Sequence, residues 1–179
     1  MPPWKIWYEG PQFRYEQPQA GRYRQFTQVG VEVLGADDPQ VDIDVIALGW
    51  EFYRSLGLRQ VELVVNSMGD ASCRPGYLDA LTAYLQDRRD DLTDQSQVTL
   101  DRNPLRVLDS KRPDDQAAVI DAAPSMVDHL NEECGEHFAV VRAGLDALGI
   151  PYSMSARLVR GFDSVSYTHL TLPTIGEVE

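Results

Sequence analysis

Cysteine, histidine and positive charge are all scarce in this sequence of 179 residues. It contains 2 cysteines and 3 histidines, and its 16 lysines and arginines are outnumbered by 28 aspartates and glutamates, which gives a formal net charge of −12. Cys73 and Cys134 lie far apart along the chain and match neither a disulfide framework nor the spacing of a zinc or redox motif. We therefore expect two free thiols in a reducing cytoplasm and no metal site.

The sequence also has no apolar run of 18 residues and no charged-then-apolar leader at its start, so no membrane segment is expected. An acidic total argues against broad, non-specific nucleic-acid binding. It leaves room for a local phosphate site, because Arg14, Arg22 and Arg24 lie close together in the sequence. A hydrophobic fraction of 43% and a mean hydropathy of −0.32 are typical of a globular domain with an apolar core.

The apolar residues follow strand and helix patterns in alternation, which predicts a mixed α/β class. Aromatic and β-branched residues predict two strands joined by a loop rich in proline and glycine, with a kink or bulge at Gly10-Pro11 in the first strand. Asp38-Pro39 predicts the start of a helix and Gly57 its end. We expect strands at 5–16, 23–34, 61–66 and 152–159, and helices at 39–56, 72–89 and 124–148.

The two predicted N-terminal strands carry an unusual row of polar side chains. Because alternate residues of a strand share a face, Arg14 and Glu16 point one way, and so do Arg24, Phe26, Gln28, Gly30 and Glu32. From the pattern alone, this row is either a solvated sheet face or a ligand-binding face. Gly30 favours the second alternative, since a glycine within a strand allows a ligand to approach the backbone closely.

The sequence contains FRYE at residues 13–16, GRYRQFTQVGVE at 21–32, NPLRVLDSK at 103–111 and LVRGFD at 158–163. In this order they resemble segments of the histidyl-tRNA synthetases, a family of class II aminoacyl-tRNA synthetases. Residues 13–16 (FRYE) resemble the part of motif 2 that class II enzymes share, and residues 21–32 (GRYRQFTQVGVE) resemble the more specific part found in the histidine enzymes. Residues 103–111 (NPLRVLDSK) and 158–163 (LVRGFD) resemble two further family segments in the same order, the second being the start of the histidine-specific motif. The resemblance selects the ligand-binding alternative for the polar row.

The resemblance implies a partial class II catalytic core in residues 1–163, with a mainly antiparallel mixed sheet, flanking helices and a helical insertion at about 90–150. It implies activation of L-histidine with ATP and Mg²⁺, followed by transfer to tRNA(His), by a cytoplasmic homodimer. Motif 1 and motif 3 are not found in the sequence, so we expect a fragment that is itself inactive. An alternative is the synthetase-like regulatory subunit of an ATP phosphoribosyltransferase, and a pseudo-domain of a regulatory kinase is a third.

The same resemblance implies a role for each matching residue. Arg14 would bind the α-phosphate of ATP, and Arg160 would lie on the other side of that phosphate, where both arginines act in catalysis. Arg160 would also belong to the histidine site. The other implied ligands are Glu16 and Phe26 for adenine, Arg22 for the terminal phosphates, Gln28 for the histidine amino group and Glu32 for the imidazole.

The C-terminal segment departs from the family. Where the histidine-specific motif continues with two tyrosines, this chain has Ser164, and residues 165–174 (VSYTHLTLPT) resemble the translation of a transposon-type sequencing adapter. We therefore predict that residues 164–179 are a non-native tail.

Sequencing the source DNA across the Asp163–Ser164 junction should show the natural reading frame continuing into a tyrosine codon, with no adapter sequence. A continuous genomic read that encodes residues 164–174 as printed would contradict this prediction.

Overall fold

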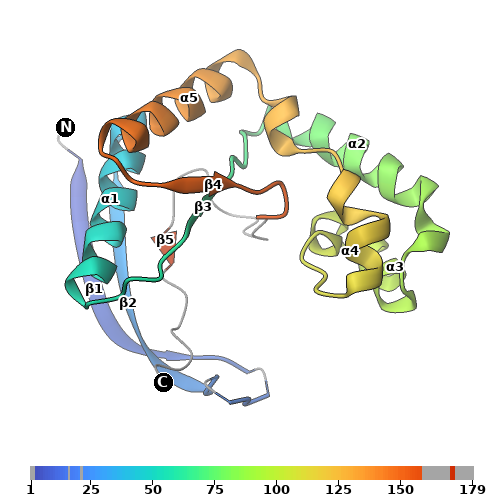
Figure 1. The fold of residues 1–179 in the computed structure, drawn as a ribbon, viewed down its shortest axis with the longest axis horizontal. Coiled ribbons are helices and arrows are strands. Elements are labelled where there is room, and N and C mark those ends of the chain that lie inside the picture. The colour runs from blue at the N-terminus through green and yellow to red at the C-terminus, as the bar shows by residue number, and fades with distance from the viewer. Residues whose placement is uncertain (1–2, 16, 21, 159–169, 172–179) are drawn as a thin grey trace. The chain divides into compact units, whose positions relative to one another are not determined.

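The computed structural model describes residues 3–15, 17–20, 22–158 and 170–171, which divide into two compact units. The first unit contains β1 (Trp4–Phe13), β2 (Gln25–Leu34), α1 (Pro39–Ser55) and the short β5 (Leu170–Thr171). The second unit contains the remaining helices and strands, from β3 to β4 (Figure 1). One antiparallel sheet, one parallel strand pair and the helices around them confirm the predicted α/β (α+β) class.

The strands of the first unit form a sheet in the order β1-β2-β5. β1 and β2 are a long antiparallel hairpin whose register runs without a break from Trp4 opposite Leu34 to Phe13 opposite Gln25. β5 pairs antiparallel with β2, with Thr171 opposite Gly30. The rest of the predicted tail, residues 164–169 and 172–179, lies outside the described residues, so its non-native origin stays a prediction.

Of the two predicted alternatives at Gly10-Pro11, the bulge is wrong, because the ladder passes through both residues in unbroken register. The Arg14 amide donates to the Arg24 carbonyl across 2.8 Å, which makes this opposed pair a hydrogen-bonded one. Hydrogen-bonded and non-hydrogen-bonded pairs alternate along an antiparallel ladder, so Pro11 and Thr27 form a non-hydrogen-bonded pair. The nitrogen of Pro11 therefore points away from β2, where a missing N–H costs the ladder nothing.

Helix α1 begins and ends where the sequence predicts. The Asp38 side chain accepts a hydrogen bond of 2.9 Å from the Gln40 amide, Pro39 follows the cap, and Gly57 adopts a positive φ of 82° after the last turn. Ile43 and Val45 are buried, and Lys5 of β1 forms an ion pair of 2.8 Å with Asp44 of α1. The cap stabilises the start of α1, and the ion pair joins the helix to β1.

The second unit combines a small parallel strand pair with a group of short helices. β3 (Leu63–Val65) pairs in parallel with β4 (Tyr152–Met154). These strands are shorter than the predicted ranges 61–66 and 152–159. The helices include α2 (Arg74–Asp87), α3 (Asp94–Leu100), α4 (Pro113–Ala118) and α5 (Glu132–Ala147), with 3-10 turns η1 (Arg89–Asp91), η2 (Pro104–Val107), η3 (Ile120–Ala122) and η4 (Met126–His129). No helix within the described ranges is long and apolar enough to cross a membrane.

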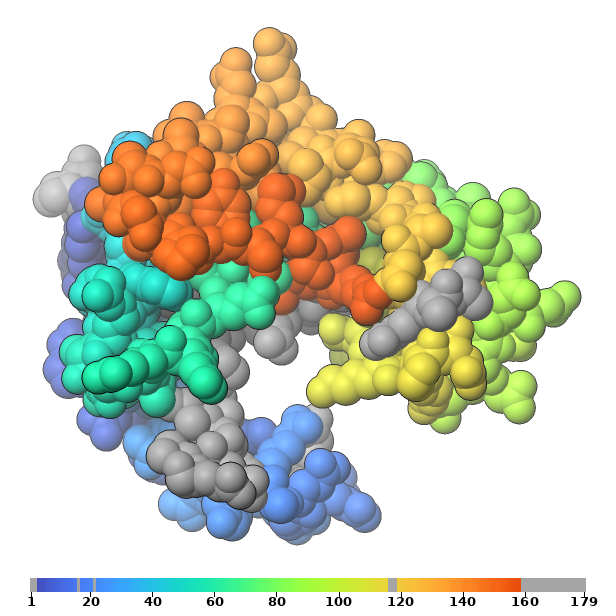
Figure 2. All heavy atoms as spheres, viewed as in Figure 1, coloured from blue at the N-terminus to red at the C-terminus, as the bar shows by residue number. Residues whose placement is uncertain are grey.

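The apolar core of the second unit is built on α2. Tyr77, Leu81 and Leu85 follow one another at intervals of four residues and are 2%, 0% and 0% exposed. They pack with buried residues of the segments that follow, among them Leu92, Leu100, Val107 and Ile120. The space-filling view shows these segments, green to yellow, as one packed mass (Figure 2). The buried face of α5 is predicted correctly at Phe138, Val141 and Leu145, but Leu148, just beyond the helix, is 57% exposed.

A buried carboxylate organises the helices that follow α2. Asp115 is 0% exposed, and its oxygens accept hydrogen bonds from the Thr93 amide (2.8 Å) and from the hydroxyls of Thr93 (3.1 Å), Ser96 (2.6 Å) and Ser110 (2.7 Å). Burial alone would raise the pKa of Asp115, but these hydrogen bonds outweigh it and hold the pKa below the ordinary carboxyl value. One side chain thus joins α3, α4 and the loop between them.

Replacement of this carboxylate, Asp115→Asn, should lower the free energy of unfolding by about 1–3 kcal/mol, because an amide cannot accept all four hydrogen bonds. Since folding lowers the pKa of Asp115, its contribution is complete above the ordinary carboxyl pKa and is lost as pH falls through the lowered value. Urea unfolding of the two proteins at neutral and acidic pH measures both effects. Asp114→Asn, at the exposed neighbouring position, is the matched control; equal effects of the two substitutions would contradict the prediction.

Candidate active site

The hairpin register decides which side chains of β1 and β2 share a face. Residues directly opposite one another in an antiparallel pair point to the same side of the sheet. Phe26 is opposite Gln12, Gln28 is opposite Gly10, and Glu32 is opposite Ile6. Arg14, opposite Arg24 at the end of the ladder, extends the same row. The aromatic ring, the amide, the carboxylate and the Arg14 guanidinium therefore lie along one face, while Val29, Val31 and Val33 occupy the other.

Arg14 lies on the ring of Phe26. Its guanidinium carbon is 3.7 Å from the ring centroid, a cation–π contact between the two strands. The Nε atom of Arg14 is buried and has no hydrogen-bond partner among the described residues. A buried guanidinium donor left without an acceptor is unusual in a folded protein, and an anionic ligand at this point would satisfy it.

Tyr8 fills the space above Gly30. The two residues are opposed in the register, and a Cβ atom added to Gly30 would lie 2.2 Å from Cζ and 2.5 Å from Oη of the Tyr8 ring. Only glycine tolerates this approach. The space over Gly30 that was expected to admit a ligand is therefore occupied by the Tyr8 ring of β1.

The hydroxyl of Tyr8 also reaches Glu32, two residues beyond Gly30 on the same face. Burial raises the pKa of Tyr8, and so do the hydrogen bond to Glu32 and the negative charge of that carboxylate. Tyr8 is not among the site residues expected from the sequence, although strand parity points to it: Tyr8 and Arg14 are separated by an even number of residues along the same strand direction, so they share a face.

Three other predicted residues are placed less completely. Arg22 is exposed and comes directly after the tip of the hairpin, where its backbone amide and carbonyl pair with Gln19 at 2.9 and 3.1 Å. Glu16 and Arg160 lie outside the described residues. Their assigned roles, like those of Arg14, Arg22, Phe26, Gln28 and Glu32, stay predictions.

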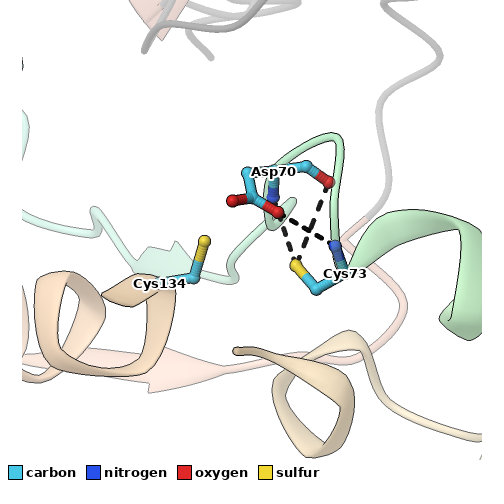
Figure 3. A group of neighbouring side chains, drawn as sticks. All are labelled: Asp70, Cys73 and Cys134. Atoms are coloured by element: carbon cyan, nitrogen blue, oxygen red, sulfur yellow. Dashed lines mark hydrogen bonds between the residues drawn. The ribbon is translucent and has the colours of Figure 1, made fainter. Parts of the chain in front are cut away.

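A second group of reactive side chains lies in the second unit. Asp70 and Cys73 stand on the turn before α2, and Cys134 projects from the first turn of α5 toward them (Figure 3). One carboxylate oxygen and the two sulfur atoms all lie within 4.8 Å of one another. Both cysteines are free thiols, as expected, and the fold brings their sulfur atoms close together although the two residues are distant in sequence.

Comparison with known proteins gives a consistent result. A sequence model described as "Histidyl-tRNA synthetase" matches residues 2–86. The chain is 46% identical to the histidine–tRNA ligase of Geobacillus sp. (strain WCH70) over 177 residues, 99% of the chain and 41% of that relative. It is 49% identical to the histidine–tRNA ligase of Parasynechococcus marenigrum over 164 residues, 92% of the chain and 38% of the relative. The crystal structure of apo S. aureus histidyl-tRNA synthetase matches with a TM-score of 0.64 and 39% identity, covering 92% of this chain and 37% of that one.

Nearly the whole chain is thus similar to part of known histidyl-tRNA synthetases. The match to the S. aureus structure confirms the prediction of a partial class II catalytic core. The chain spans about two fifths of the length of the curated relatives it matches. Those relatives are named as ligases, which favours the ligase prediction over the regulatory subunit of an ATP phosphoribosyltransferase.

The contact between Tyr8 and Glu32 predicts a measurable change in titration. Glu32→Gln removes a negative charge and a carboxylate acceptor from beside the phenol, so the pKa of Tyr8 should fall toward the ordinary tyrosine value. An NMR pH titration of the chain with ring-labelled tyrosine measures it, and the Tyr8→Phe spectrum assigns the signal. Glu9→Gln, on the opposite face of the hairpin, should leave the titration unchanged. A Tyr8 pKa that does not respond to Glu32→Gln would contradict the contact.

Proposed function

We propose that this chain is part of the catalytic domain of a histidine–tRNA ligase. Such an enzyme joins the histidine carboxylate to the α-phosphate of ATP as histidyl-adenylate and releases pyrophosphate, and it then transfers the histidyl group to tRNA(His) and releases AMP. The observation that carries the proposal is the shared hairpin face, where a cation, an aromatic ring, an amide and a carboxylate follow one another in fixed register. Adenylate formation needs this combination, because its two substrates present a phosphate, a planar base, an amino group and an imidazole.

The Arg14 end of the face would bind the nucleotide. The guanidinium keeps its charge at any physiological pH and offers paired donors to the α-phosphate. Because this group now lies 3.7 Å over Phe26, adenine would stack on that ring either after Arg14 moves to the phosphate or from the other side. The unpartnered Nε of Arg14 supports the first possibility, since a phosphate oxygen would supply the missing acceptor. Mg²⁺ would enter with ATP as part of the substrate, Arg22 would contact the terminal phosphates, and Glu16 would accept from the adenine amino group.

The Glu32 end of the face would bind histidine. Gln28 would accept a hydrogen bond from the amino group through its amide oxygen, and Glu32 would accept from the imidazole N–H. Gln28 and Glu32 are four residues apart on β2, which separates their Cα atoms by roughly 13 Å. Each side chain would therefore extend toward the bound histidine from an opposite end of the molecule. Arg160 would lie on the far side of the α-phosphate, where a second fixed cation stabilises the charge that develops as the carboxylate attacks phosphorus.

The remaining partners of the proposed enzyme follow from the reaction. tRNA(His) would receive the histidyl group, and the full-length protein would act as a homodimer in the cytoplasm. The regulatory alternative would need histidine binding without catalysis, and it does not require Arg14 and Arg22. The presence of both arginines in the sequence supports the catalytic reading.

The test is histidine-dependent exchange of pyrophosphate into ATP by the full-length protein that carries this sequence. Gln28→Ala should lower kcat/KM for histidine about 10- to 100-fold, the effect of losing a hydrogen bond to a charged group. Gln25→Ala, an exposed glutamine on the opposite face of the same strand, should leave kcat/KM within about twofold of the wild type.

Arg160→Ala in the same protein should abolish the exchange, and residues 1–179 alone should support none. The absence of histidine-dependent exchange in the full-length wild type would instead favour the regulatory subunit.

A further inference from the structure

The group Asp70, Cys73 and Cys134 lies in a different unit from the hairpin face, and adenylate formation gives it no role. Two cysteines, in a chain that has no others, converge with a carboxylate from segments about sixty residues apart. Among the described residues, Asp70, Cys73 and Cys134 form a group of three possible metal ligands whose donor atoms all lie within 4.8 Å of one another. We propose that these three side chains form a binding site for one soft divalent metal ion of the Zn²⁺ class.

Hydrogen bonds hold the two segments that carry these three side chains next to each other. The Asn131 side chain donates to Oδ2 of Asp70 (3.0 Å) and to the Ser72 hydroxyl (2.7 Å), while its own oxygen accepts from the Cys134 amide (2.8 Å). One asparagine therefore ties the turn before α2 to the start of α5. The donor atoms stay close together because the backbone that carries them is held on both sides.

The turn that carries Asp70 and Cys73 is equally constrained. Gly69 has a positive φ of 59°, and a Cβ atom there would lie 2.6 Å from the Cys73 sulfur. The Asp70 amide donates to that sulfur across 3.3 Å. Backbone N–H groups pointed at a sulfur stabilise its thiolate form, and such hydrogen bonds are a regular feature around metal-bound cysteines.

The donor set suits a metal of this class. Asp70 and Cys73 are separated by two residues, the short chelate spacing found in one half of structural zinc sites. Two thiolates and a carboxylate provide three ligands, which leaves one position for water in a tetrahedral complex. Oδ1 of Asp70 already accepts three hydrogen bonds, from Ser72 N, Ser72 Oγ and Cys73 N, whereas Oδ2 accepts one, from Asn131. A carboxylate oxygen has two lone pairs, so Oδ2 retains one for a metal.

The local electrostatics also favour a cation. The Asp70 carboxylate places a negative charge within 4.8 Å of both sulfur atoms. The guanidinium of Arg74, the next residue after Cys73, is directed at the backbone carbonyls of Met68 and Gly69 instead. A divalent ion would supply the missing positive charge and deprotonate both thiols, so that M²⁺ and two Cys–SH groups give the dithiolate complex and two released protons.

The experiment adds Co²⁺ alone to the reduced, folded 179-residue chain and follows the absorption spectrum. We expect one Co²⁺ per chain, a near-ultraviolet sulfur-to-cobalt charge-transfer band, and release of two protons per ion in weakly buffered solution. Zn²⁺ should displace the Co²⁺ and abolish the band, and it should raise the melting temperature, because it binds the folded form.

Four variants identify the ligands. Cys73→Ser and Cys134→Ser should each weaken Co²⁺ binding at least tenfold and reduce the charge-transfer intensity, because each retains a single thiolate. Asp70→Asn preserves the turn-capping oxygen but removes the charge, so it should weaken binding about tenfold with the band retained. Asp79→Asn, an exposed carboxylate of α2, should change nothing.

Circular dichroism of each metal-free variant checks that it folds. If Cys73→Ser does not fold, Cys134→Ser still tests the proposal, because Cys134 is partly exposed and tolerates substitution more readily than the buried Cys73. A folded wild-type chain without a charge-transfer band would overturn the proposal. So would a band that persists in folded Cys134→Ser, or one equally strong in the chain unfolded in urea, which would mark binding by unstructured thiols.

Discussion

The register between β1 and β2 is the constraint on which the candidate active site depends. Ten consecutive residues of each strand are paired in one antiparallel ladder, and a shift by a single residue would turn every side chain to the opposite face. The hairpin must therefore be held in register along its full length. The valines at 29, 31 and 33 contribute to this, since they form a continuous apolar row on the face opposite the polar one.

Within that frame, Gly30 has a specific role. Most glycines in strands weaken the ladder, but here the absence of a side chain admits the Tyr8 ring, which would otherwise collide with a Cβ atom. The ring in turn carries a hydroxyl to Glu32. A second side chain that limits the rotamers of a carboxylate also fixes its orientation, so Gly30, Tyr8 and Glu32 form one local arrangement.

The second unit is stabilised on different principles. Its apolar core on α2 is conventional, but its short helices have little stability of their own and are joined by buried polar groups. Asp115 collects four donors from the start of α3 and the loop before α4, and Asp70 collects four from the turn before α2 and from the loop before α5. The hydrogen bonds from Cys73, Ser72 and Asn131 hold the pKa of Asp70 far below the ordinary carboxyl value. At Asp115 and at Asp70, the hydrogen bonds of one carboxylate join short segments that have little regular backbone hydrogen bonding of their own.

The sequence by itself determined the hairpin, the limits of α1, the shared face of Phe26, Gln28 and Glu32, and the resemblance to one family of synthetases. These are local properties: strand parity, capping residues and contiguous motifs are written within a few neighbouring residues. Tertiary structure alone decided that Pro11 fits the ladder, that Tyr8 covers Gly30, that Asp115 joins three segments, and that Cys73 meets Cys134. Each of these depends on which distant segments lie side by side, and neither composition nor periodicity records that information.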